Sequence, residues 1–251
     1  LALVTPCGEL VTAEPTPAPF PDLTGRWAMI QVMPALATLP ILGEVEVTTT
    51  VTSLVDVEQD GASLTLCGAY CSSNVEMTPP LVAMRIPEAF LALLRPAPRA
   101  ASLEARDGVW QFVQPPVTEV RGAVLANPET DSLPTHAADA RVIDQDGDGH
   151  PGLTVSVSVA GLVSGDTYVV ERLRFSLCGR VTAPDTIIGS IDWQSEQRIV
   201  AATDALLLLS YAYRPDRDST RHLFLMRRTG ADGTCARARE LLAELLQAAG
   251  S

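Results

Sequence analysis

The chain contains no lysine, so all 18 of its basic side chains are arginine. Aspartate and glutamate together number 30, which gives a formal net charge of -12. This negative charge disfavours binding to nucleic-acid phosphates and electrostatic docking on anionic lipid. We therefore expect no nucleic-acid partner for this protein.

Long apolar runs are also missing. Residues 205–209 form a typical run, and it is far shorter than the roughly 20 apolar residues that cross a bilayer. The sequence therefore predicts no transmembrane helix. Its first residues, Leu-Ala-Leu-Val, are compatible with the end of a signal-peptide apolar segment. The expectation of an exported protein rests on the cysteines and on the carboxylate loop described below, because Ca²⁺ is plentiful outside the cell.

Histidine is scarce, and no catalytic motif surrounds His136, His150 or His222. The chain has no His-Glu-x-x-His pair, no Gly-x-Ser-x-Gly turn and no glycine-rich phosphate loop. The sequence therefore predicts no catalytic and no cofactor-binding residue. Enzyme activity stays open, and a non-catalytic role is favoured.

Five cysteines are present, and their spacing fits no zinc site. Export would favour disulfide bonds, and an odd number of cysteines leaves one thiol over. The sequence does not decide the pairing among Cys7, Cys67, Cys71, Cys178 and Cys235.

Proline occupies every second position from Pro15 to Pro21. Such a run is extended and cannot pack as a helix, so we interpret residues 1–21 as a tether and residues 22–251 as a single domain. A tether behind a cysteine is typical of a lipoprotein with Cys7 as the lipid attachment site. Because Pro6 precedes that cysteine, we favour a disulfide partner or a free thiol at Cys7.

Alternation of apolar and polar residues dominates the domain. In residues 43–57, valines alternate with glutamates and threonines, and Asp60-Gly61 then favours a tight hairpin into residues 62–67. Further strands are predicted at residues 109–113, 117–125, 153–160, 167–177, 186–193, 198–213 and 222–228, with helices at 87–94 and 236–248. The sequence predicts a mainly β fold, either an antiparallel β-barrel or a β-sandwich, with a C-terminal helix.

One loop carries a pattern typical of a cation site. Asp144, Asp146 and Asp148 stand at alternate positions, Gly149 supplies a sharp turn, and the His150 carbonyl falls at the seventh position. Ca²⁺ takes 6–8 oxygen ligands from such loops. We expect these residues to bind Ca²⁺ in a structural role.

The same loop resembles the EF-hand loop and, more closely, the Asp-rich loops of FG-GAP modules, because a predicted β-strand follows it directly. Those modules have aspartate at the ninth position, where this chain has Gly152. Water or a distant carboxylate would then complete the coordination shell, and Asp139 is the nearest candidate.

A second resemblance lies in Gly25-Arg26-Trp27, which is similar to the Gly-x-Trp sequence that begins lipocalin barrels. That resemblance implies a tryptophan that closes one barrel end and packs against an arginine of the last strand. Arg227 and Arg228 are the candidates. It also implies a helix after the last strand.

These features favour an exported, non-catalytic, calcium-stabilised β-barrel or sandwich that binds a small apolar ligand or a surface protein. It would be secreted, periplasmic or attached to the cell surface. One alternative is a structural subunit of a cell-surface or extracellular assembly, including a homo-oligomer. Another is a secreted hydrolase with an unrecognised site.

Overall fold

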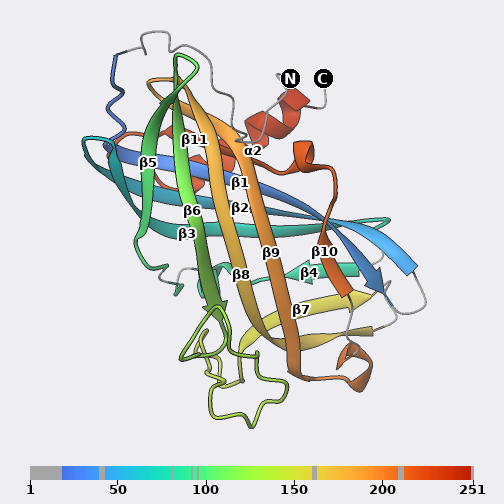
Figure 1. The fold of residues 1–251 in the computed structure, drawn as a ribbon. Coiled ribbons are helices and arrows are strands. Elements are labelled where there is room, and N and C mark those ends of the chain that lie inside the picture. The colour runs from blue at the N-terminus through green and yellow to red at the C-terminus, as the bar shows by residue number, and fades with distance from the viewer. Residues whose placement is uncertain are drawn as a thin grey trace.

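The computed structural model describes residues 19–39, 43–80, 82–91, 93–94, 96–159, 163–208 and 212–249. It is mainly β with a C-terminal helix, as predicted, and all its strands pair antiparallel in one 11-stranded sheet (Figure 1). The strands are β1 (Gly25–Leu39), β2 (Gly43–Asp60), β3 (Ser63–Thr78), β4 (Val82–Arg85), β5 (Arg99–Arg106), β6 (Val109–Arg121), β7 (Leu153–Val159), β8 (Val163–Ala183), β9 (Thr186–Ala202), β10 (Ala212–Pro215) and β11 (Leu223–Arg228). The helices are α1 (Glu88–Leu91) and α2 (Cys235–Ala249), with short 3-10 helices η1 (Ala205–Leu208) and η2 (Ser219–Arg221).

The strand pairings form a closed ring. Its order is β1, β2, β3, β5, β6, β8, β9, β11 and back to β1. In Figure 1, β1, β2 and β3 run across the picture, while β6, β8 and β9 run from top to bottom. The sequence left a barrel and a sandwich open, and this closed pairing is that of a barrel.

Several strands of the barrel change their pairing partner along their length. β3 pairs with β5 near residues 63–66 and with β4 at residues 74–75, while β8 pairs with β6 and then with β7. β1 likewise pairs with β11 and then with β10. We call the part walled by β5 and β11 the β5 half, and the part walled by β4, β7 and β10 the β7 half.

Irregular pairings mark the boundary between the halves. The register of β2 on β3 shifts between Thr52 and Ser53, and that of β6 on β8 shifts between Gln114 and Val117. Residues 115–116 are both proline and cannot donate to a ladder. The sequence predicted two strands here, but the structure has one strand, β6, that continues through a bulge.

Several other elements differ from the prediction. The helix predicted at residues 87–94 is the short α1, and the strand predicted at 198–213 is divided among the end of β9, η1 and β10. The sequence missed β4 and β5 altogether. No helix in the described residues is long and apolar enough to span a membrane.

Large side chains fill the β5 half. Its fully buried residues include Trp27, Leu66, Phe112, Leu177, Ile187, Phe224 and Met226. The rings of Phe112 and Phe224 lie 5.9 Å apart. A Cβ at Gly179 or Gly189 would lie 2.7 or 2.5 Å from the Phe224 ring, so only glycine fits beside it. This half of the barrel is therefore a solid core.

Arg228 closes the end of the β5 half. Its guanidinium carbon lies 4.6 Å from the centroid of the buried Trp27 ring. The same guanidinium donates to the carbonyl oxygens of Asp22 and Thr24, where the chain enters β1. Arg227 instead pairs with Asp185 at 3.1 Å.

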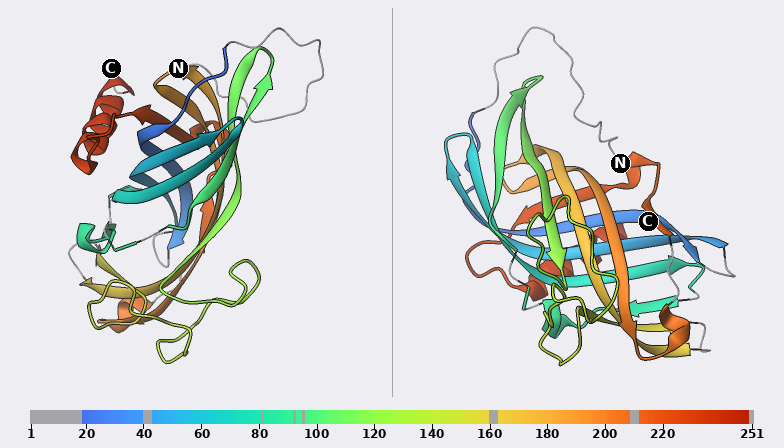
Figure 2. Two further views of the ribbon diagram at one scale, coloured as in Figure 1. Left: turned by 90° about the vertical axis from the view of Figure 1, so that its left-hand side faces the viewer. Right: turned by 60° about the horizontal axis from the view of Figure 1, so that its bottom comes forward.

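The C-terminal helix α2, predicted at residues 236–248, lies outside the barrel (Figure 2, left). Its residues Ala238, Leu241 and Leu242 pack against Ala28 and Ile30 on the outer face of β1. A disulfide between Cys71 and Cys235 ties the helix to β3.

Of the other cysteines, Cys178 is disulfide-bonded and Cys67 is an exposed free thiol. Cys7 and most of the predicted tether, residues 1–18, lie outside the described residues.

Candidate functional site

The acidic loop belongs to the long connection between β6 and β7, and both ends of that connection rest on β8. Gly122 and Gly152 both have positive φ angles, 75° and 85°. A Cβ on either residue would lie 2.6 or 2.7 Å from the carbonyl oxygen of Val169. The Gly122 N–H also donates to the Gln145 side chain at 2.6 Å. Close backbone contact therefore fixes the loop against the barrel wall.

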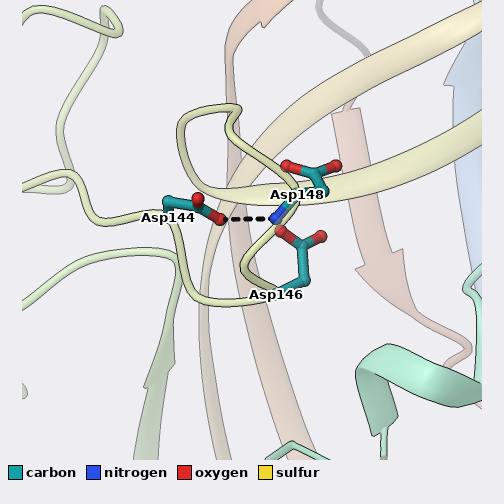
Figure 3. A group of neighbouring side chains, drawn as sticks. All are labelled: Asp144, Asp146 and Asp148. Carbon is teal, nitrogen blue, oxygen red and sulfur yellow. Dashed lines mark hydrogen bonds between the residues drawn. The ribbon is translucent and has the colours of Figure 1, made fainter.

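The structure brings the three predicted aspartates together. One carboxylate oxygen each from Asp144, Asp146 and Asp148 lies within 4.8 Å of the others (Figure 3). Asp144 accepts from the backbone N–H groups of Gly147, Asp148 and Gly149, which curls the loop around its carboxylate. This group of hard oxygen atoms could hold a metal ion.

Thr154, the second residue of β7, joins the loop to the strand. Its N–H donates to Asp146 Oδ2 at 2.8 Å, and its hydroxyl donates to Asp148 Oδ2 at 2.5 Å. The other oxygen of Asp146, Oδ1, is buried and has no hydrogen-bond partner within the described part of the chain. A buried carboxylate oxygen without a donor is a suitable ligand for a cation.

The loop electrostatics also suit a cation. Burial and the neighbouring charge of Asp148 raise the pKa of Asp146, despite the N–H donated by Thr154. Burial acts in the same direction on Asp148, but the Thr154 hydroxyl and the His150 N–H lower its pKa overall. A bound cation would stabilise both carboxylates in their charged form.

The other two predicted metal ligands, Asp139 and His150, make contacts outside the cluster of three aspartates. Asp139 is engaged by Arg141, whose Nε and Nη2 donate to its two oxygens at 3.0 and 2.7 Å, and these bonds hold the pKa of Asp139 well below its ordinary value. The cluster of three carboxylates does not include it. The His150 ring stacks on Tyr168 with centroids 4.7 Å apart, and ligation by the His150 carbonyl stays a prediction.

A second candidate site is a cavity of about 460 Å³ in the β7 half. Its wall is mainly apolar, with residues from β1, β2, β3, β4, β7, β8, β9 and β10. The apolar lining includes Met33, Val47, Val51, Val75, Met84, Leu153, Val155, Val157, Leu173, Phe175 and Ile199. Cavities of this size and lining are typical of sites for small molecules.

A charged cluster forms one side of this cavity, where residues 67–73 of β3 have neither β5 nor β4 as a partner in the described pairings. Arg121 donates to Glu171 at 3.0 Å, to Glu119 at 2.9 Å and to the Tyr70 hydroxyl at 3.0 Å. Tyr70 in turn donates to Glu119 at 2.6 Å. Side chains thus bridge β3 and β6 where backbone pairing stops.

Further contacts complete the cluster. Ser195 and Gln197 on β9 donate to the second oxygen of Glu171 at 3.0 and 3.1 Å. Arg99, which packs over the Phe175 ring, lies 4.0 Å from Glu119. Two arginines therefore face two glutamates, and their formal charges cancel.

Burial raises the pKa of the Tyr70 phenol to about 12, so Tyr70 remains a neutral donor. Burial would also raise the pKa of Glu119, but the charge of Arg121 and the Tyr70 hydroxyl lower it overall. The cluster is therefore a stable charged pair at neutral pH rather than a proton-transfer group.

Sequence reasoning missed these cavity residues. Tyr70, Arg121 and Glu171 are about 50 residues apart in the chain, with separations of 51 and 50 between the bonded pairs. The alternation of Glu119 and Arg121 along β6 is typical of a solvated strand face. No local pattern in the sequence shows that this face is turned inward.

His222 is buried and hydrogen-bonded on both sides of its ring. Its Nδ1 accepts from the Trp193 indole N–H at 2.8 Å, and its Nε2 lies 2.9 Å from the carbonyl oxygen of Asp216. Both ring nitrogens therefore have partners.

Comparisons of this chain with protein-family models, curated proteins and solved structures found no match.

Proposed function

We propose that this protein is a non-catalytic binding protein that holds a small, largely apolar ligand inside the β7 half of the barrel. The observation that carries the proposal is the apolar cavity of about 460 Å³ beside a fully packed β5 half. A barrel selected only for stability would fill both halves, because unfilled apolar volume lowers the free energy of unfolding.

The acidic loop has a supporting role in this proposal. Thr154 binds Asp146 and Asp148, while its neighbours Leu153 and Val155 line the cavity. Ca²⁺ bound by the three aspartates would fix β7 in position and so stiffen one wall of the ligand site. The three oxygen-bearing side chains and the orphan oxygen of Asp146 support this assignment.

A lipocalin-like organisation and an exported location belong to the same proposal. The Trp27–Arg228 contact, the ring of eight strands and the outer helix α2 support the first. The disulfide between Cys71 and Cys235 supports the second, because such bonds persist in oxidising compartments.

A fluorescence titration with N-phenylnaphthylamine, a neutral apolar probe, tests the cavity. We expect saturable binding with enhanced, blue-shifted emission. Val75→Trp, which places a large ring in the cavity, should abolish it. Asn74→Trp, the matched control on the exposed outer face of the same strand, should leave it intact.

Folding of both variants is checked by circular dichroism and thermal melting. Binding that is equally strong in wild type and Val75→Trp would place the probe outside the cavity and contradict the proposal. Absence of binding of any apolar probe to folded wild type would contradict it as well.

A further inference from the structure

Gln31 is a buried polar side chain with no protein partner. It lies on β1 between the inward-facing Met29 and Met33, its exposed fraction is 5%, and it lines the cavity. Its amide makes no hydrogen bond to a described residue, and its atoms are not among the fully enclosed, unpartnered polar atoms. The amide therefore borders the open space of the cavity, where its donors and acceptor can bind a ligand.

Gln31 lies on the floor of the cavity. Its neighbour across the β1–β11 pairing is Phe224, which belongs to the solid core of the β5 half. From that floor, β9 runs through Trp193, Ser195 and Gln197 toward η1, where the exposed Leu206 also lines the cavity. A ligand that reaches Gln31 therefore places its polar end deep and its apolar body toward η1.

A second polar side chain lies in the same row. Gln31 pairs with Val51, and Val51 pairs with Ser73, so the three residues line one wall across β1, β2 and β3. The half-buried Ser73 hydroxyl makes no hydrogen bond to any described residue. Neighbouring strands lie about 4.8 Å apart, and β2 lies between β1 and β3, so the backbones of Gln31 and Ser73 are about two strand spacings apart. A polar group of a ligand placed between them, over Val51, can be reached by the long Gln31 side chain from one side and by the Ser73 hydroxyl from the other.

The other polar groups of the lining are already engaged. Both terminal nitrogens of Arg121 donate to protein acceptors, and Glu171 accepts from Arg121, Ser195 and Gln197. Thr167 donates to the Val155 carbonyl. The cavity thus offers neither a free positive charge for an anion nor a free negative charge for a cation.

We propose that the ligand of this cavity is a neutral amphipathic molecule, with an uncharged hydroxyl or amide group at Gln31 and Ser73 and an apolar chain or ring system against the valine-rich wall. This inference rests on the proposed binding function. The charges that line the cavity already cancel one another. A ligand with a charged head group would therefore lose its hydration without gaining an opposite charge, and this desolvation lowers its affinity for the cavity.

The test is a competition experiment on the wild-type protein, in which ligands of equal chain length displace bound N-phenylnaphthylamine. The four competitors are dodecanol, dodecanamide, dodecanoate and dodecylammonium at neutral pH, the two neutral ones below their solubility limits and the two ions below their critical micelle concentrations. We expect the alcohol and the amide to bind about tenfold or more tightly than either ion.

Two substitutions then locate the polar head group. Gln31→Leu should weaken dodecanamide about tenfold, and Ser73→Ala about threefold, since each removes a hydrogen bond to the ligand. Binding of N-phenylnaphthylamine itself should change little in both. Gln194→Leu, on the exposed face of β9, is the matched control and should leave every affinity unchanged.

The outcomes separate this inference from the proposed function. If the probe binds but dodecanoate or dodecylammonium is the tightest competitor, the cavity is a binding site and the neutral-ligand inference is wrong. If Gln31→Leu and the control Gln194→Leu change the affinity for dodecanamide to the same extent, the inference is also wrong. If neither the probe nor any competitor binds to the folded protein, the binding function itself fails.

Discussion

The β5 half and the β7 half of this barrel share β1, β2, β3, β8 and β9, yet one half is solid and the other hollow. In the β5 half, Trp27, Phe112 and Phe224 point inward and fill the space. In the β7 half, valine, serine and threonine side chains of the same strands line a cavity of about 460 Å³, together with larger side chains such as Phe175 and Trp193. In our proposal, this unfilled space is the ligand site.

Buried polar groups occur in both halves. Arg99 lies on β5 and is buried, and the buried amide of Gln114 has no hydrogen-bond partner within the described residues. At the boundary between the halves, Arg121, Glu119 and Glu171 form a compensated cluster. Such groups are costly to bury, and of these side chains Arg121 and Glu171, together with Gln31, line the cavity.

The largest contrast should come from removing apolar volume in each half. Phe224→Ala should lower the free energy of unfolding by about 4 kcal/mol, because it leaves a cavity in a packed core. Val75→Ala, at the wall of an existing cavity, should cost less than about 1 kcal/mol. Urea denaturation measures both, and equal losses would mean that the β7 half is packed as tightly as the β5 half.

The second largest loss of unfolding free energy should come from breaking the charged cluster. Arg121→Met leaves Glu119 and Glu171 buried without their cation, which should cost about 3 kcal/mol of unfolding free energy. Arg198→Met, which removes an exposed pair with Glu196, is the control and should cost less than about 1 kcal/mol. A comparable loss in both would show that the cluster contributes no more than a surface pair.

Calcium should stabilise the protein through the β7 half. At a free concentration of about a hundred times its Kd, Ca²⁺ should add about 2.7 kcal/mol to the free energy of unfolding, with a matching rise in Tm over the chelated protein. Asp146→Asn should remove the response. Asp139→Asn should retain it if the Arg141 contact is the main role of Asp139.

No change in the Tm of the wild type on chelation would contradict the metal assignment, and so would an undiminished calcium response in Asp146→Asn. Loss of the response in Asp139→Asn would instead restore Asp139 as a ligand. Magnesium at the same concentration serves as the test of ion identity.

The smallest effect concerns pH. The pKa of Glu119 in the folded protein lies below its ordinary value of 4.5, so its interactions stabilise the fold fully above that pH. This contribution is lost as the pH falls below 4.5 through the folded pKa. Wild type should therefore lose stability there more steeply than Glu119→Gln, and parallel curves of unfolding free energy against pH would contradict this role.

Much of the fold could be predicted from local pattern. Alternating valines in residues 43–57 placed β2, and the Asp60–Ser63 pairing confirms the hairpin expected at Asp60-Gly61. β5 was missed because its inward-facing residues begin with Arg99 and Ala101, which do not form an apolar stripe. β4 was missed because it is only 4 residues long.

The candidate sites divide in the same way. The three aspartates of the acidic loop are close in sequence, so their spacing predicted their clustering. The cavity depends on strand exchange and on contacts between distant residues, such as Tyr70 with Glu119. Only the closed barrel turns those side chains inward, and no local spacing records that closure.

The most direct test of a ligand site inside the β7 half is a crystal structure of the protein soaked with bromododecane, with the anomalous signal of bromine as the readout. We predict a bromine peak within the cavity, enclosed by the walls that contain Val75 and Val155. Bromine peaks found only on the outer surface, with the cavity empty of ligand density, would contradict the account.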